Sequence, residues 1–192
     1  MTSEKYSICI CPSADIIDRI TEWKNELRNA IGWYNSVNSK AHITIAEFNA
    51  DEKQLKIVIN HLKEFANKAT PFDVAFSHLG TFPNGAFFLS ADSPSKEKLQ
   101  TLMSGFNKSF KIATTTKSNN PHISIGRKLT DEKIRIAQEL FNKPFNDFTF
   151  SCDRITLRKF DPIQRQFFIE SEYLFQAAAD LDSEIVQFSL FD

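Results

Sequence analysis

One order of predicted elements occurs twice in this chain: strand, helix, strand that opens on a histidine, helix, strand. Apolar residues that recur every three to four positions predict helices, and short alternating or continuous apolar runs predict strands. The first copy has strand-like segments at 6–11, 41–48 and 72–79, and helical stripes at 16–31 and 55–69. The second copy has strand-like segments at 86–90 and 123–127, helical stripes at 99–110 and 134–140, and a strand region from Pro144-Phe145.

This repeat predicts an α+β fold with two lobes related by a pseudo-twofold axis around a central cleft. Each lobe is expected to be a mostly antiparallel sheet with helices on its outer face. We expect a single bilobal domain at 1–175, with lobes at roughly 1–80 and 81–175, and a C-terminal tail at 176–192. Strands near 154–160 and 167–175 are expected to complete the second sheet.

Local signals refine this expectation at the ends of the helices. Gly32 is placed to end the first helix, and Thr130 is placed to cap the fourth. Ser93 followed by Pro94 predicts the start of the third helix. The polar stretch "TTTKSNN" at 114–120 is expected to be a loop.

The two histidine strands carry the same short motif. His42-Ile43-Thr44-Ile45 recurs 80 residues later as His122-Ile123-Ser124-Ile125. Alternate residues of a strand point to the same side, so each histidine projects with its hydroxyl neighbour while the isoleucines face a core. If the strands lie side by side in the cleft, two imidazoles and two hydroxyls converge.

This set of groups suits phosphodiester hydrolysis without a metal or cofactor. One neutral imidazole can accept a proton from water, and a second imidazole, protonated, can donate one to the leaving oxygen. The hydroxyls of Thr44 and Ser124 can hydrogen-bond the non-bridging phosphate oxygens. Two alternatives remain open: the histidines could be metal ligands, or the cleft could be a non-catalytic binding module for nucleotides or RNA ends. His61 and His78 lack the motif, and we assign neither a role.

Composition limits the partners and the setting. The net charge of −1 predicts no strong binding surface for long duplex nucleic acid, although a small anionic ligand or an RNA end remains compatible. The N-terminal residues do not resemble a signal peptide, no apolar stretch is long enough to span a bilayer, and three cysteines are an odd number for a disulfide framework. We therefore expect a cytoplasmic protein with no membrane contact.

The two tetrapeptides resemble the paired H-x-T/S-x signature of the 2H phosphoesterase superfamily, and within it the 2′-5′ RNA ligases or RNA 2′,3′-cyclic phosphodiesterases. The resemblance implies hydrolysis of 2′,3′-cyclic phosphate ends of RNA or nucleotides to 2′-phosphates, with 2′-5′ ligation as the reverse type of reaction. It also implies that His42 is the general acid, that His122 is the general base and that Arg127 binds phosphate. The residues themselves do not distinguish the two histidine roles, and a cyclic nucleotide derivative from tRNA processing is another candidate substrate.

Aromatic and basic residues near the motifs are candidates for binding the rest of a substrate. Trp33, Tyr34 and Phe48 could stack against a base, or could pack in the core instead. Basic side chains could line one rim of the cleft and attract an RNA end, namely Lys111, Lys117, Arg127, Lys128, Arg158 and Lys159.

The end of the chain carries a separate motif. Gln187-Phe188-Ser189-Leu190-Phe191 resembles the peptide by which bacterial replication and repair proteins dock on the sliding clamp. The resemblance implies a sliding-clamp contact, with Leu190 and Phe191 in an apolar pocket of the partner. The alternatives are a tail that packs on its own lobe and a strand for self-association.

Overall fold

The computed structural model describes residues 3–142 and 148–178. The strands are β1 (Glu4–Ile10), β2 (Ile43–Ala50), β3 (Phe72–Phe82), β4 (Ala86–Ala91), β5 (Thr114–Lys117), β6 (His122–Gly126), β7 (Thr149–Cys152), β8 (Arg154–Asp161) and β9 (Gln166–Leu174). The helices are α1 (Ala14–Ile31), α2 (Glu52–Lys68), α3 (Ser93–Ser109) and α4 (Asp131–Leu140). The predicted strand at Pro144-Phe145 and the clamp motif at 187–191 lie outside the described residues.

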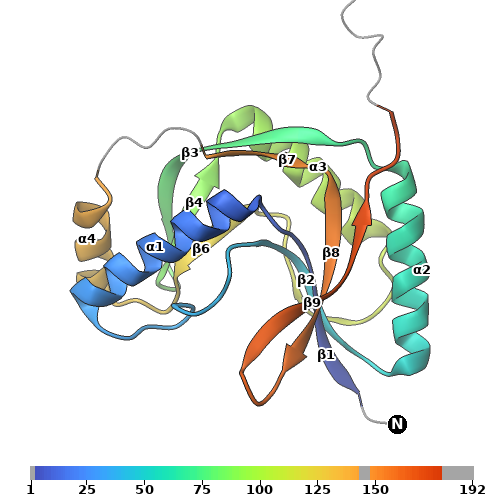
Figure 1. The fold of residues 1–192 in the computed structure, drawn as a ribbon, viewed down its shortest axis with the longest axis horizontal. Coiled ribbons are helices and arrows are strands. Elements are labelled where there is room, and N and C mark those ends of the chain that lie inside the picture. The colour runs from blue at the N-terminus through green and yellow to red at the C-terminus, as the bar shows by residue number, and fades with distance from the viewer. Residues whose placement is uncertain (1–2, 143–147, 179–192) are drawn as a thin grey trace, which may run out of the picture.

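The strands form two antiparallel sheets. The first has the order β5-β2-β1-β8-β9, and the second has the order β6-β4-β3-β7. The two sheets curve around the middle of the molecule, and helices lie on the outside (Figure 1). The predicted α+β class, with two similar antiparallel lobes, is confirmed.

The two sheets share one arrangement, which reveals the pseudo-twofold relation directly. Four strands in the order β2-β1-β8-β9 correspond to four in the order β6-β4-β3-β7. The third strand of each set comes from the other half of the chain, since β3 belongs to the second sheet and β8 to the first. The expectation that the strands near 154–160 and 167–175 complete the second sheet was therefore wrong. A hydrophobic pattern marks a strand but does not state which neighbour it pairs with.

The helices are also exchanged between the halves. α1 contacts α4 and β6, and its Trp23 packs against Phe141 and Phe148 with ring centroids 5.0 Å away in each case. α2 contacts β2, β8 and β9, and Phe65 of α2 meets Phe106 of α3 edge to face at 5.1 Å. α1 therefore packs against elements of the second half and α2 against strands from both halves, so the two lobes cannot be separated by cutting the chain once.

The ends of the helices follow ordinary capping chemistry. Gly32 ends α1 at φ 76°, and the Thr130 hydroxyl accepts from the Lys133 amide at 3.4 Å, as predicted. Asp92 rather than Ser93 caps α3, because its carboxylate accepts from the Ser95 amide at 2.8 Å. A carboxylate at this position also interacts favourably with the positive end of the helix dipole.

One strand was missed in the sequence. The stretch read as a polar loop contains β5, which pairs antiparallel with β2 at the edge of the first sheet. Its residues are threonines and a lysine, half-buried or exposed. An edge strand with solvent on one side needs no apolar alternation, and β-branched threonine is favourable in strands.

Candidate active site

The two histidine motifs have the same local structure in the two sheets. His42 directly precedes β2, and His122 is the first residue of β6. The burial pattern is identical in both: the histidine and the hydroxyl residue are partly accessible, and the isoleucines after each are fully buried. These isoleucines are Ile43, Ile45, Ile123 and Ile125, all 0% exposed. Full burial of each stabilises the fold by about 1.5–3 kcal/mol, so the core holds both strands in register.

Both imidazole rings are held by the same hydrogen bond. Nδ1 of His42 lies 2.7 Å from the carbonyl oxygen of Lys40, and Nδ1 of His122 lies 2.9 Å from that of Asn120. A carbonyl oxygen can only accept, so Nδ1 carries the hydrogen in each ring. In the neutral form, Nε2 is then left with a free lone pair. Both histidines are thus set in the tautomer in which Nε2 can accept a proton.

The fold brings the two motifs together from opposite sheets. β2 and β6 contact each other although they are not paired by backbone hydrogen bonds in one sheet. The charge of His122, when protonated, lowers the pKa of His42, which requires the two rings to be near each other. The predicted convergence of the two histidine strands is therefore observed.

Both histidines are neutral in the unliganded protein at neutral pH. Burial lowers the pKa of His42 to about 3, and the nearby guanidinium of Arg158 adds to the effect. Burial also lowers the pKa of His122, with a contribution from Arg127 in the same direction. An imidazole here would gain a proton only when an anion binds beside it and offsets these effects.

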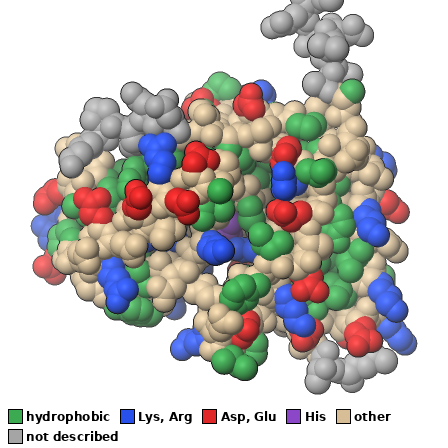
Figure 2. Space-filling view, viewed as in Figure 1, with side chains coloured by type: hydrophobic (Ala, Val, Ile, Leu, Met, Phe, Trp, Pro, Cys, Tyr) green, Lys and Arg blue, Asp and Glu red, His purple; other side chains and the backbone are tan. Residues whose placement is uncertain are grey.

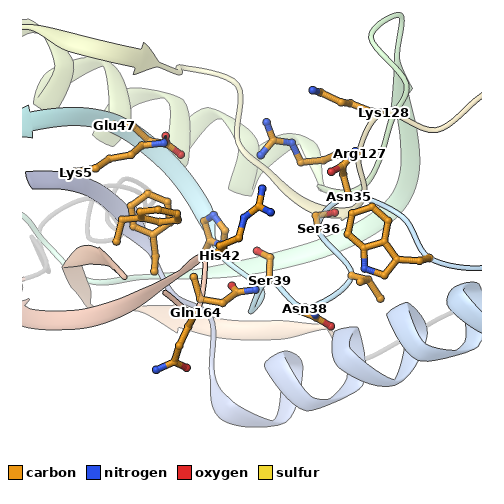
Figure 3. A pocket seen from close by; sticks show the side chains of 16 residues that line it. Lys5, Asn35, Ser36, Asn38, Ser39, His42, Glu47, Arg127, Lys128 and Gln164 are labelled. Atoms are coloured by element: carbon orange, nitrogen blue, oxygen red, sulfur yellow. Dashed lines mark ion pairs between the residues drawn. The ribbon is translucent and has the colours of Figure 1, made fainter. Parts of the chain in front are cut away.

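His42 lies in the wall of a cleft of about 710 Å³. The rest of its lining comes from the loop at 33–39 between α1 and β2, the residues just after β6, the hairpin that joins β8 to β9, and Lys5 of β1 with Glu47 of β2. Figure 3 shows His42 between Arg127 and Lys128 at one end and Lys5 and Glu47 at the other. We call the first end the loop end and the second the hairpin end.

The charge of this cleft differs from that of the chain as a whole. Lys5, Arg127, Lys128 and Arg165 line it, against one carboxylate, Glu47. Glu47 is bound to Lys5 at 2.7 Å, so the remaining cations face the cleft without that carboxylate as a partner. Figure 2 shows basic side chains at a hollow in the middle of this face, with histidine behind them. A local excess of positive charge suits an anionic ligand, although the chain carries a net charge of −1.

Arg127 and Trp33 both line the cleft, and their roles in binding phosphate and a base stay predictions. Arg127 is exposed in the cleft, and its backbone amide donates to the carbonyl of Asn35 at 3.2 Å, which ties the end of β6 to the loop at 33–39. Trp33 lines the same end of the cleft with 65% of its surface exposed. An exposed indole beside a guanidinium can stack against a base.

Tyr34 and Phe48 do not lie in the cleft, and their predicted role in base stacking was wrong. Tyr34 is 3% exposed, and its hydroxyl donates to the backbone carbonyl of Lys24 at 3.0 Å. Phe48 is 0% exposed and packs against Tyr6 and Phe110. Both residues pack in the core instead, which was the alternative. Phe48 lies on the buried face of β2, and Tyr34 lies in the loop after α1 and packs into the same hydrophobic core.

Only part of the predicted basic rim lies at the cleft. Among the six basic residues proposed for it, Arg127 and Lys128 line the cleft, whereas Lys159 is paired with Glu4 at 2.8 Å. Arg158 is 5% exposed, donates to Ser7 Oγ at 3.0 Å and has no partner for Nε within the described residues. It acts on His42 through its charge from behind the cleft wall. An arginine that directly follows the buried residues 155–157 of one strand was the available signal for this role.

The hairpin residues of the cleft were missed altogether. Phe160, Gln164, Arg165, Gln166 and Phe167 line the cleft, and Phe160 and Phe167 lie next to Lys5 at its hairpin end. The sequence-based prediction places β8 and β9 in the sheet of the second lobe, which contains His122, rather than in the sheet that contains the strand after His42. Phe160 and Phe167, on either side of the polar turn between β8 and β9, could have indicated a binding surface. That inference requires the order of the strands in the sheet, which the sequence does not give.

Across 3–142 and 148–178 no group of three or more histidine, cysteine, aspartate or glutamate side chains is arranged to hold a metal ion. None of the helices in this part of the chain is long and apolar enough to cross a bilayer.

Known proteins resemble this chain in sequence or in fold. A predicted phosphoesterase of Bacillus cytotoxicus is 31% identical over 146 residues, which cover 73% of this chain and 80% of that protein. The crystal structure of E. coli LigT in apo form matches with a TM-score of 0.64 at 14% identity, covering 91% of this chain and 98% of LigT. LigT complexed with 3′-AMP gives a TM-score of 0.64 at 13% identity and covers 92% of this chain and all of LigT. At these identities the likeness to LigT concerns the fold.

Two antiparallel lobes with one histidine-hydroxyl motif in each define a phosphoesterase of the 2H class. A model of the 2′-5′ RNA ligase superfamily matches residues 12–163, which is most of the chain. The protein belongs to that superfamily.

Proposed function

We propose that this protein is a metal-independent phosphodiesterase that hydrolyses 2′,3′-cyclic phosphate ends of RNA or nucleotides to 2′-phosphates. The observation that carries the proposal is the matched pair of imidazoles. His42 and His122 come from different sheets, hold their Nδ1 hydrogens in the same way and keep Nε2 free. An acid and a base on either side of one phosphorus atom are what this reaction needs.

These two side chains account for both proton transfers of the reaction. Nε2 of one neutral histidine accepts a proton from water as the water oxygen forms a bond to phosphorus. The bond between phosphorus and the 3′ oxygen breaks, and Nε2 of the other histidine, protonated, donates its proton to that oxygen. Following the family resemblance, we assign the donor role to His42 and the acceptor role to His122. The same steps with a 5′ hydroxyl in place of water as the nucleophile would form a 2′-5′ bond, and the 3′ oxygen would again leave with the donated proton.

Thr44, Ser124 and Arg127 are proposed to bind the phosphate. Thr44 and Ser124 lie two positions after the histidines on the same faces of β2 and β6 and are partly accessible. Their hydroxyls can donate to the non-bridging oxygens, where negative charge increases in the transition state. Arg127 can add a charge-assisted hydrogen bond from the loop end of the cleft.

The proton for the leaving oxygen enters the site together with the substrate. Both histidines have lowered pKa values in the unliganded protein, so neither is protonated at neutral pH. A cyclic phosphate carries one negative charge, and its approach raises the pKa of a nearby imidazole. Substrate binding is therefore expected to be accompanied by proton uptake, and kcat/KM is expected to have a bell-shaped pH profile.

The decisive experiment is turnover of a panel of 2′,3′-cyclic mononucleotides and oligonucleotides that end in a cyclic phosphate, with the phosphate position of the product identified by NMR. His42→Ala and His122→Ala should each lower kcat by about 10²–10⁴-fold. His78→Ala, which removes an exposed histidine on β3, is the matched control and should keep wild-type activity. Turnover that stops on addition of a chelator would indicate histidines acting as metal ligands. Binding of these compounds without turnover would indicate a non-catalytic module.

A further inference from the structure

We infer that the hairpin end of the cleft binds the nucleotide that precedes the reacting one, so that the substrate class is an oligonucleotide of two or more residues rather than a mononucleotide. This inference rests on the proposed function. It concerns Phe160, Arg165 and Phe167 of the β8–β9 hairpin together with Lys5 of β1, residues for which the acid-base chemistry has no use.

The first observation is where the chain places its unfavourable backbone conformations. Within the described residues, three residues other than glycine have positive φ: Ser36 at 77°, Lys128 at 55° and Arg165 at 53°. All three line the same cleft. Left-handed φ is uncommon for lysine and arginine, and such strained residues concentrate at ligand-binding sites. Lys128 follows β6 at the loop end and Arg165 belongs to the β8–β9 hairpin, so two separate segments of the cleft wall each hold one strained basic residue.

The second observation is the aromatic pair beside Arg165. Phe160 and Phe167 are paired across β8 and β9 with ring centroids 5.1 Å apart, and both are partly accessible in the cleft wall. Lys5 Nζ lies 5.7 Å and 5.3 Å from the centres of these two rings. Aromatic faces next to cations form a binding site for a base followed by a phosphate.

The third observation is that this site is separate from the place of the chemistry but continuous with it. His42 lies between the hairpin end and the loop end of one cleft (Figure 3). A reacting nucleotide whose cyclic phosphate lies at His42 and Arg127 can place its own base beside Trp33 at the loop end. The hairpin end is then free for the preceding nucleotide.

The charges support a phosphate as well as a base at this end. Lys5 is neutralised by Glu47 at 2.7 Å, whereas Arg165 forms no ion pair with any described residue. The guanidinium of Arg165 is therefore the cation at the hairpin end that can bind a backbone phosphate. Its backbone φ of 53° raises the conformational free energy of the folded chain, which a glycine at the same position would not do.

The experiment compares a dinucleotide with a mononucleotide that ends in the same 2′,3′-cyclic phosphate. The dinucleotide should have a kcat/KM at least about 10-fold higher, because stacking of one more base contributes appreciably. Phe167→Ala and Arg165→Gly should lower kcat/KM for the dinucleotide more than for the mononucleotide, so that most of this advantage is lost. Arg165→Gly should also unfold at the same temperature as the wild type or at a higher one, because glycine relieves the backbone strain. Arg165→Asn, which also tolerates positive φ, is the second variant, and Ile163→Ala at the exposed hairpin tip is the control.

Equal kcat/KM for the two substrates, or equal losses on both in the Phe167 and Arg165 variants, would overturn the inference while leaving the proposed function intact. Absence of turnover on every cyclic phosphate would instead remove the proposed function. The hairpin site is then decided by calorimetry, in which a dinucleotide ending in a 2′-phosphate is compared with a nucleoside 2′-monophosphate. Tighter binding of the dinucleotide that is lost in Arg165→Asn supports the site, and equal affinity refutes it.

Discussion

His42→Gln should make the protein less sensitive to acid. Burial lowers the pKa of His42 from 6.5 to about 3 in the folded protein, whereas in the unfolded chain it returns to its ordinary value. Between these two values the unfolded state binds a proton that the folded state does not. The contribution of neutral His42 to stability is therefore complete above about pH 6.5 and is lost as the pH falls towards 3. Glutamine cannot be protonated, so the variant lacks this contribution to the pH dependence.

The size of the effect follows from the same pKa values. At about pH 4.5, some two pH units below the unfolded pKa, full linkage corresponds to about 2.7 kcal/mol. His42 borders an open cleft and is only partly buried, so solvent screening reduces the expected difference to about 1–2 kcal/mol. Carboxylates and the other histidines titrate in both proteins, and their contributions cancel in the comparison.

The assay is urea unfolding of the wild type and of His42→Gln at about pH 7.5 and about pH 4.5. The wild type should lose about 1–2 kcal/mol more than the variant between these two pH values. His78→Gln, which removes an exposed imidazole on β3, controls for the loss of a histidine as such. Parallel losses in the wild type and His42→Gln would show that His42 is not held neutral by burial, and the proposed proton uptake with substrate would lose its basis.

Three further predictions, with four substitutions, test other parts of the structure. Thr44→Val and Ser124→Ala should each lower kcat by about 10–10³-fold, measured on a cyclic phosphate, because a hydrogen bond to the phosphate is lost; unchanged kcat in both would exclude them from the site. Tyr34→Phe should leave kcat/KM unchanged and lower the free energy of unfolding by about 1 kcal/mol, because the Tyr34 hydroxyl donates a hydrogen bond to a backbone carbonyl. A large loss of activity would instead support a role for Tyr34 in substrate binding. Gly85→Ala should destabilise the protein by about 2 kcal/mol or more, because Gly85 has φ 78° and an added Cβ would lie 2.4 Å from the carbonyl oxygen of Leu129; a melting temperature equal to that of the wild type would contradict this.

Much of the site could be read from local pattern. The alternation of partly accessible and buried residues in both motifs follows from the two-residue period of a strand, so the shared direction of His42 with Thr44, and of His122 with Ser124, needed no tertiary information. The four helices were predictable for a similar reason, since each has an apolar stripe at helical spacing. The convergence of the two motifs was an inference from the repeat, and contact between β2 and β6 agrees with it.

Pairing between distant segments was decided only by the folded chain. The sequence by itself determined the class of fold, the two motifs and the side of each strand on which the histidines lie, because these depend on periods of two or 3.6 residues. Tertiary structure decided that β8 joins the first sheet, that Tyr34 is buried, and that Arg158 and the hairpin come to lie near His42. A strand offers the same backbone groups to any partner, so its neighbour depends on how the whole chain buries its apolar surface.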